Sequence, residues 1–221
     1  INLRQSELRV LQAQINPHFL YNTLDSIIWL AESGQKDQVV QMVSSLSDFF
    51  RTTLSKGRDY ITLHEEEMHI RSYLQIQQFR YRDILDYSIR IPQQMASYPI
   101  LKLTLQPLVE NAIYHGMEFM DGDGEILVKA ERDGERLCIT IADNGLGMTA
   151  EQVQGLLTGK TRSASGKGSG IGVKNVNERI RLYFGEDFGL DIRSEPDEGT
   201  EILIRLPAVS FEELMERDKR A

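Results

Sequence analysis

The spacing of apolar residues changes part-way along the chain, and that change limits the folds available to it. Residues 1–56 place apolar side chains every three or four positions, as on one face of a helix. Later segments alternate apolar and polar residues, as half-buried strands do. The alternating segments are 85–91, 126–130, 137–141 and 202–206, with helical patterns near 103–116 and 172–184 between them. We therefore predict an α+β fold, in which N-terminal helices precede a two-layer sandwich of a sheet and one layer of helices.

The first helical segment carries a proline and two apolar stripes. Pro17 removes a backbone donor and costs about 3 kcal/mol inside a helix, so we expect the regular helix to break there. The apolar residues before and after it lie roughly half a turn apart around the axis. They are Leu8, Leu11 and Ile15 before the proline, and Leu20, Leu24, Ile27, Ile28 and Ala31 after it. Gly34 is expected to end the helix.

His18 lies directly after the proline, on a polar face of the same segment. At about 100° per residue this face holds four polar residues and points away from the second apolar stripe. They are Gln14, His18, Asn22 and Asp25. We therefore expect His18 to be accessible to solvent. The alternative, a histidine buried in the core, requires the polar face to arise by chance.

The next helical segment has a wide apolar stripe. Its members are Val39, Met42, Val43, Leu46, Phe49, Phe50 and Leu54. One antiparallel partner helix cannot cover a stripe of this width, so we predict a four-helix bundle made by two chains, that is, a homodimer. The alternative is that the second half of the same chain covers the stripe.

A local helix-start signal helps to divide the chain into predicted domains. Thr62 and Glu65 have the capping-box spacing, which predicts that a helix begins there. We expect a helical hairpin over residues 1–57, a second domain over 58–208 and a charged tail over 209–221 that forms at most a frayed helix.

The net charge of −8, from 25 basic and 33 acidic residues, argues against a general nucleic-acid or anionic-membrane binder. The single cysteine, Cys138, cannot form an internal disulfide, which suits a reducing compartment. No run of about 18 apolar residues is present, so no membrane-spanning segment is predicted. The chain opens with Ile1 and directly enters a helical pattern, so we expect it to be a piece of a longer protein.

The stretch IADNGLGM (141–148) ends an alternating strand in an acid and two glycines. The sheet would hold Asp143, while Gly145 and Gly147 would let the backbone turn closely around a flat ligand. A carboxylate there can accept a hydrogen bond from an exocyclic amine such as that of adenine. The alternative is an ordinary hairpin turn at the Asn-Gly pair.

Glycines crowd the segment 159–172, after which a helical pattern begins. Bare amides and the N-terminus of the next helix suit anionic phosphates, and Lys160, Arg162 and Lys167 add positive charge. The spacing fits neither the P-loop nor the dinucleotide fingerprint. The alternative is a flexible surface loop.

Asn111 stands among apolar residues in LQPLVENAIYHG (105–116). An amide carbonyl is a suitable oxygen ligand for Mg²⁺, which usually keeps several waters and binds substrate phosphates. Alternatively, Asn111 is a core amide tied to the backbone. His115 is expected to pack or hydrogen-bond rather than bind a metal, because no second histidine or carboxylate is placed to help it.

Together and in this order, these stretches resemble the nucleotide-binding motifs of the GHKL ATPase superfamily, which includes gyrase, Hsp90, MutL and histidine kinases. The similar stretches are ENAIYHG for the N box, DNGLGM for the G1 box, GKGSGIGVKN for the G2 box and GTEILIRLP (199–207) for the G3 strand. With LQAQINPHFLYNTL upstream, the chain resembles sensor histidine kinases of the LytS/YesM type from about residue 8 to 207.

The resemblance implies a Mg·ATP pocket and a phosphoacceptor histidine. His18 matches the phosphorylated position, Asn111 would hold Mg²⁺, and Asp143 would bind the adenine amino group. The other cofactor-binding residues would be Gly145 and Gly147 in the base pocket, Lys167, Gly168, Gly170 and Gly172 in the lid and phosphate cradle, Thr200 on the adenine side, and His115.

Two departures from the family pattern bear on mechanism. ATP-hydrolysing members have a glutamate four residues before the N-box asparagine, where this chain has Pro107, so hydrolysis by an activated water is disfavoured. Many histidine kinases have an acid directly after the phosphorylated histidine, where this chain has Phe19. Asn22 is expected to hold a ring nitrogen of the histidine or to position the phosphoryl group, and Asp25 to take the proton; Glu110 is a weaker candidate.

The resemblance therefore predicts ATP-dependent phosphorylation of His18, followed by transfer to an aspartate on the receiver domain of a response regulator. The parent protein would be a bacterial membrane receptor with this piece in the cytoplasm. Two alternatives are an ATP-hydrolysing GHKL enzyme and a catalytically silent, nucleotide-binding scaffold.

Overall fold

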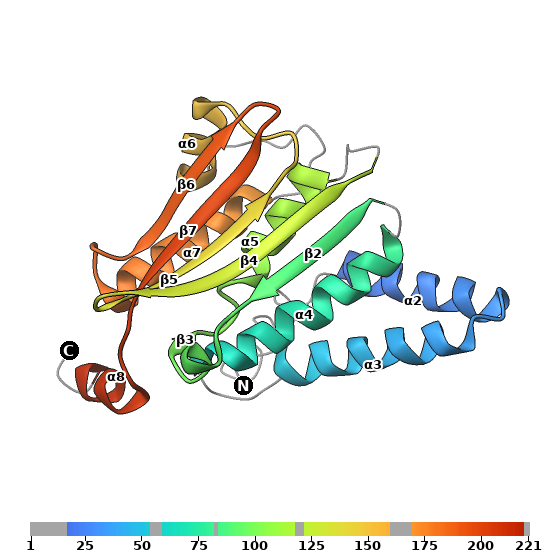
Figure 1. Cartoon of the computed structure of the whole chain (residues 1–221), viewed down its shortest axis with the longest axis horizontal. Coiled ribbons are helices and arrows are strands. Elements are labelled where there is room, and N and C mark those ends of the chain that lie inside the picture. Colours follow the sequence, from blue (N-terminus) through green and yellow to red (C-terminus); the bar gives the residue numbers. More distant parts are fainter. Residues whose placement is uncertain (1–16, 54–58, 82–83, 118–121, 160–168, 219–221) are drawn as a thin grey trace, which may run out of the picture.

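The computed structural model describes residues 17–53, 59–81, 84–117, 122–159 and 169–218 (Figure 1). Within these ranges a helical hairpin is followed by a sheet with helices packed on it, which confirms the predicted α+β class. None of the described helices is long and apolar enough to cross a membrane.

The hairpin consists of α2 (Pro17–Glu32) and α3 (Lys36–Thr53). Gly34 ends the first helix as predicted, because its φ of 74° is left-handed and lets the chain reverse. Pro17 is the first residue of α2 that the structure describes. The predicted break concerns the residues before Pro17, which lie outside the described part.

The next helix, α4 (Leu63–Arg80), begins at the predicted capping box. The backbone nitrogen of Thr62 donates to Glu65 Oε2 at 2.8 Å, and that of Glu65 donates to Thr62 Oγ1 at 3.1 Å. In space α4 lies between the hairpin and the sheet (Figure 1). It therefore contacts both parts of the molecule.

The wide stripe of α3 is partly covered by this chain itself. Met42 and Phe49 are buried against α4, so α4 of the same chain covers these two residues. On α2 the buried residues are Phe19, Thr23 and Leu30, not those of the predicted second stripe. Both helices retain exposed apolar side chains, namely Tyr21, Leu24, Ile28, Trp29, Val40 and Val43.

Five strands form one mixed sheet in the order β2-β4-β5-β7-β6. They are β2 (Leu85–Arg90), β4 (Gly124–Asp133), β5 (Arg136–Asp143), β6 (Gly189–Glu195) and β7 (Gly199–Pro207). β2 pairs parallel with β4, and the other pairings are antiparallel. The four alternating segments of the sequence correspond to β2, β4, β5 and β7, as predicted.

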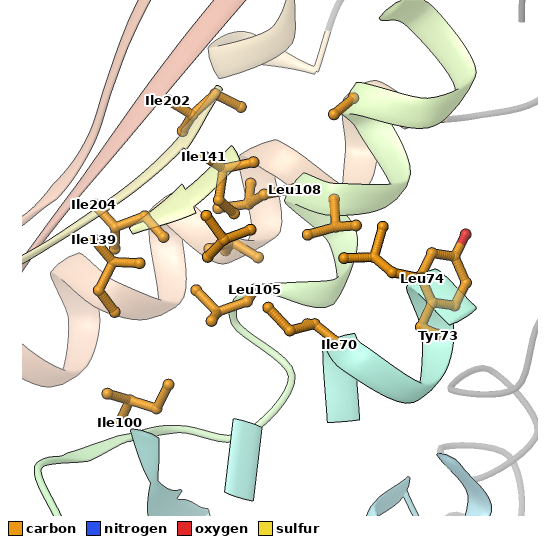
Figure 2. Close-up of a cluster of buried hydrophobic side chains, with 14 of the residues drawn as sticks. Ile70, Tyr73, Leu74, Ile100, Leu105, Leu108, Ile139, Ile141, Ile202 and Ile204 are labelled. Carbon is orange, nitrogen blue, oxygen red and sulfur yellow. The ribbon is translucent and has the colours of Figure 1, made fainter. Parts of the chain in front are cut away.

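The helices on the sheet are α4, α5 (Gln106–Asn111), α6 (Ala150–Thr158) and α7 (Ser169–Phe184). Buried side chains from the sheet and from these helices meet in one core (Figure 2). Ile139, Ile141, Ile202 and Ile204 on the strands face Ile70 and Leu74 of α4 and Leu105 and Leu108 at α5 (Figure 2). This core fixes α5 against the middle of the sheet.

Several elements differ from the expectation. The helix predicted over 103–116 begins only at Gln106, and after Asn111 the chain winds into a π-helical turn, η2 (Ala112–Met117). The sequence patterns also missed α6, β6 and a small sheet of β1 (Tyr60–Thr62) with β3 (Pro99–Leu101), beside the short 3-10 turn η1 (Gln93–Met95). The tail forms a helix, α8 (Phe211–Asp218), with Leu214 buried.

Candidate phosphoacceptor and nucleotide site

His18 occupies the first turn of α2 and is exposed, as predicted. The side-chain amide nitrogen of Asn22, one turn later, lies 3.0 Å from Nδ1 of His18 and 3.3 Å from Nε2. An amide can donate with its nitrogen or accept with its oxygen, so Asn22 can hold either neutral tautomer of the ring. The structure thus brings together two of the three residues predicted at the phosphoacceptor.

Phe19, in the place where many histidine kinases carry an acid, belongs to the core. It is 4% exposed, and its ring centre lies 5.1 Å from that of Phe49 and 5.0 Å from that of Tyr73. Adjacent positions on a helix point about 100° apart, so anchoring Phe19 inward turns His18 outward.

Asp25, the third predicted residue, is exposed on α2. It follows His18 by seven positions, a rise of about 10 Å along the helix axis. It lines a groove of about 510 Å³ together with Trp29 of α2 and with Arg80 at the end of α4. The groove is therefore separate from the immediate surroundings of His18.

Asn111 ends α5 and is 1% exposed. Its side-chain oxygen, Oδ1, is buried and has no hydrogen-bond partner within the described residues. Buried polar atoms are nearly always paired, so an unpaired oxygen at this position needs an explanation. This finding speaks against the alternative of a core amide tied to the backbone through Oδ1 and fits an oxygen reserved for a cation.

The described residues contain no group of three or more histidine, cysteine, aspartate or glutamate side chains that could hold a metal. A Mg²⁺ ion with few protein ligands is typical of nucleotide sites, where waters and phosphates complete the shell. The side-chain oxygen of Asn111 is therefore a suitable ligand for Mg²⁺ that is bound together with a nucleotide.

Asp143 ends β5 and faces Thr200, its partner on β7. Burial raises the pKa of Asp143 from its ordinary 3.8 to about 6, although the backbone N–H groups of Gly145 and Thr200 oppose the rise. The Gly145 nitrogen donates to Asp143 Oδ1 at 2.9 Å. Beside these residues is a groove of about 800 Å³, lined by Asp143, Thr200 and residues of α6 and β6.

The Asn-Gly pair after Asp143 is not a hairpin turn. The chain continues into α6 instead of a returning strand. The side chain of Asn144 accepts from the Glu125 nitrogen at 2.7 Å and donates to the Asp123 oxygen at 2.8 Å, which braces the loop against β4. The hairpin alternative is therefore excluded.

Gly147 allows this loop to approach the end of β6. Its φ is 62°, and an added Cβ would lie 1.9 Å from the carbonyl oxygen of Glu195. Ser194, which no sequence pattern indicated, connects the same region. Its hydroxyl accepts from the Met148 nitrogen at 2.8 Å, donates to the Gly199 oxygen at 2.8 Å and lies 2.9 Å from Thr200 Oγ1.

Gly172 of α7 is half-buried beside α5. An added Cβ would lie 3.3 Å from Cβ of Pro107, the residue that replaces the hydrolytic glutamate. Gly170 lies in the first turn of α7, and His115 lies on η2. Lys160, Arg162, Lys167 and Gly168 lie outside the described residues, so their predicted contacts with phosphate remain predictions.

A helical hairpin with an exposed histidine, followed by a sandwich with these motifs, is the arrangement of a GHKL-type nucleotide-binding protein. Residues 6–85 match the histidine kinase profile, and residues 97–210 match the profile of the histidine kinase-, DNA gyrase B-, and HSP90-like ATPases. The chain therefore belongs to the histidine kinases, with the ATP-binding domain of that superfamily.

Individual relatives agree with this assignment. The chain is 42% identical to sensor histidine kinase YesM of Bacillus subtilis over 205 residues, which cover 93% of this chain and 34% of YesM. It is 38% identical to sensor histidine kinase BtsS of Escherichia coli over 205 residues, 93% of this chain and 34% of BtsS. The chain thus spans about a third of the length of these relatives.

Among solved structures, the fold is similar to the histidine kinase domain of a blue-light activated histidine kinase from Erythrobacter litoralis. The TM-score is 0.52 at 15% identity, and the match covers 97% of this chain and 99% of that domain. At this identity the likeness concerns the fold.

Proposed function

We propose that this chain is the catalytic core of a sensor histidine kinase, which transfers the γ-phosphoryl group of ATP to His18. The observation that carries the proposal is the exposed imidazole of His18, held by Asn22 and turned outward by the buried Phe19. A neutral imidazole keeps one nitrogen lone pair, which is the nucleophile that attack on phosphorus requires.

The ATP-binding domain would position the nucleotide. Asp143, as a carboxylate, would accept the adenine amino group, with Ser194 and Thr200 fixing the strand beside it. Asn111 would hold Mg²⁺ through Oδ1, and Mg²⁺ would neutralise charge on the phosphates. Phosphoryl transfer asks the protein mainly for positioning and charge stabilisation, which these groups can supply.

In the transfer, a ring nitrogen of His18 forms a bond to the γ-phosphorus while the bond to the leaving ADP oxygen breaks. The ring then loses a proton. Because Asp25 lies about two turns along α2, we propose that this proton reaches it through water. Phosphohistidine would then pass its phosphoryl group to an aspartate of a response regulator receiver domain, which makes that domain the proposed partner.

We also propose that two chains form a homodimer through the hairpin and that the parent protein is a membrane-bound receptor with this part in the cytoplasm. Exposed large apolar residues on α2 and α3, among them Ile28 at 55% and Val40 at 68%, support a contact between hairpins. The net charge of −8 does not favour a nucleic acid as a partner.

Incubation of the chain with γ-labelled ATP and Mg²⁺ tests the proposal. Wild-type protein should acquire acid-labile, alkali-stable label, and His18→Gln should acquire none. Equal labelling of both would refute His18 as the nucleophile. Release of free phosphate without labelled protein would indicate an ATP-hydrolysing enzyme, and bound, unconverted ATP would indicate a silent scaffold.

A further inference from the structure

A continuous series of buried contacts joins α2 to α5. Phe19 on α2 packs on Phe49 of α3, with ring centres 5.1 Å apart. Phe49 stacks on His69 of α4, with centres 4.6 Å apart and planes inclined by 19°. Nε2 of His69 lies 2.6 Å from Oε1 of Gln106, the first residue of α5. The hairpin therefore touches the start of the N-box helix through one histidine ring.

The series continues along α5 to the nucleotide site. The side-chain nitrogen of Gln106 donates to Glu110 Oε1 at 2.8 Å. Glu110 directly precedes Asn111, whose unpaired Oδ1 is the proposed Mg²⁺ ligand. Because the Gln106 amide gives its nitrogen to the carboxyl group, its oxygen faces the histidine, and Nε2 of His69 must carry the hydrogen.

The N-box helix depends on such contacts for its orientation. α5 has only six residues, no side-chain cap at its N-terminus, and a π-helical turn after it. A helix this short has little stability of its own, so tertiary contacts hold it. Glu66 of α4 is fully buried. Its carboxyl group accepts hydrogen bonds from the backbone nitrogens of Leu103 and Leu105 at 3.0 Å and 2.8 Å.

Beside the apolar packing, α4 thus makes polar contacts with α5: Glu66 binds the backbone that enters it, and His69 binds Gln106. The His69 contact also reaches the hairpin, because the same ring stacks on Phe49. His69 is 0% exposed, and burial lowers its pKa, although the bond to Gln106 opposes this shift. A neutral ring can stack on Phe49 and donate to Gln106 at the same time.

We propose that His69 is a positioning residue that couples the packing of the helical hairpin to the orientation of Asn111 and thereby to Mg·nucleotide affinity. The proposal rests on the proposed role of Asn111. A change in hairpin packing that moves Phe49 would shift the histidine ring, and the shift would reach Asn111 through Gln106 and Glu110. The contacts lie within one chain, between its own hairpin and α5. The packing of the proposed phosphoacceptor helix and the affinity of the nucleotide site would therefore depend on each other.

A double-mutant cycle tests the coupling, with calorimetric titration of the full chain by Mg²⁺ and a non-hydrolysable ATP analogue. Phe49→Leu and His69→Leu should each weaken affinity roughly fivefold to tenfold. In the His69→Leu background, Phe49→Leu should have no further effect. His69→Gln keeps a side-chain N–H donor and should restore most of the affinity. Fully additive effects of Phe49→Leu and His69→Leu, or failure of His69→Gln to restore affinity, would overturn the proposal.

Two controls separate coupling from other causes. Met42→Leu changes another buried residue of α3 that is outside the series, so affinity should remain within about twofold of wild type. Thermal unfolding of each variant shows whether it is folded at the titration temperature. If wild type does not bind the Mg·nucleotide, the proposed function fails; if it binds and Phe49 and His69 act additively, only the coupling fails.

Discussion

The amide nitrogen of Asn22 lies 3.0 Å from Nδ1 of His18, on the exposed side of α2. The two residues are one helical turn apart, where side chains meet on a helix surface. The contact restrains the imidazole without burying it. The contact therefore supports the proposed role of Asn22 in orienting the ring.

Asn22→Ala should lower the rate of His18 labelling roughly 10- to 100-fold, because an unrestrained ring spends less time aligned with the γ-phosphorus. The rate of phosphohistidine formation from γ-labelled ATP measures this. Ser44→Ala, an exposed change on α3, is the matched control and should label at the wild-type rate. A wild-type rate in Asn22→Ala would remove Asn22 from the mechanism.

Asn111→Ala should abolish the dependence of nucleotide affinity on Mg²⁺, because it removes the unpaired Oδ1. Labelling of His18 should fall roughly 100-fold or more. Titration with the nucleotide in Mg²⁺ and again in a chelator measures the dependence. In the chelator, wild type and variant should bind alike; an undiminished effect of Mg²⁺ on the variant would contradict the assignment.

Nucleotide affinity should fall as the pH drops below about 6, the raised pKa of Asp143, because a protonated carboxyl group no longer offers both oxygens to the adenine amine. The loss should approach tenfold per pH unit below that pKa. Asp143→Asn should bind more weakly at pH 7.5 and lose this pH dependence. Titrations of both proteins at several pH values use the same nucleotide, so its own protonation cancels in the comparison. Parallel pH profiles would disprove the role of Asp143.

Stability should decrease between pH 5 and 8 because of Glu66. Burial raises its pKa from the ordinary 4.5 to about 7, although the backbone N–H groups of Leu105 and Leu103 oppose the rise. The folded state therefore holds this proton more tightly than the unfolded state. The resulting stabilisation is full below pH 4.5 and is lost as pH rises through about 7. The total loss is about 3 kcal/mol.

Urea unfolding of wild type and Glu66→Gln at pH 5 and pH 8 checks this prediction. The free energy of unfolding of the variant should change less between the two pH values. Asp143 contributes in the same direction in both proteins, so the difference between them isolates Glu66. Glu212→Gln, an exposed change on α8, should follow the wild-type profile. Identical profiles for wild type and Glu66→Gln would contradict the assignment.

Gly147→Ala and Gly134→Ala form a matched pair. Both glycines have a left-handed φ, 62° and 59°, but only Gly147 would place a Cβ against backbone, 1.9 Å from the Glu195 oxygen. Gly134→Ala should cost about 1 kcal/mol in free energy of unfolding, from backbone strain alone. Gly147→Ala should cost at least about 2 kcal/mol more and weaken nucleotide binding. Equal losses in the two variants, measured by urea unfolding, would show that the close approach is unimportant.

Short-range signals in the sequence were sufficient for much of the fold. Gly34 and the Thr62–Glu65 capping box act within a few residues, so their effect does not depend on the rest of the molecule. Alternation located β4 and β7 because buried residues alternate with more exposed ones along them, and it also located β2. In β5 all residues of 137–141 are buried, so there the alternation lies in the residue types alone. β6 is an edge strand with few apolar residues and escaped detection, and Ser194 escaped with it.

The sequence alone determined the class of fold, the presence of an accessible histidine directly after a proline, and the residues that resemble a nucleotide site. These depend on periodicity, local caps and motif spacing. Only the tertiary structure decided that α4 covers Met42 and Phe49, that Oδ1 of Asn111 has no partner among the described residues, and that burial raises the pKa of Asp143. Burial and hydrogen-bond partners come from residues far apart in the chain, and no local pattern records which of them will meet.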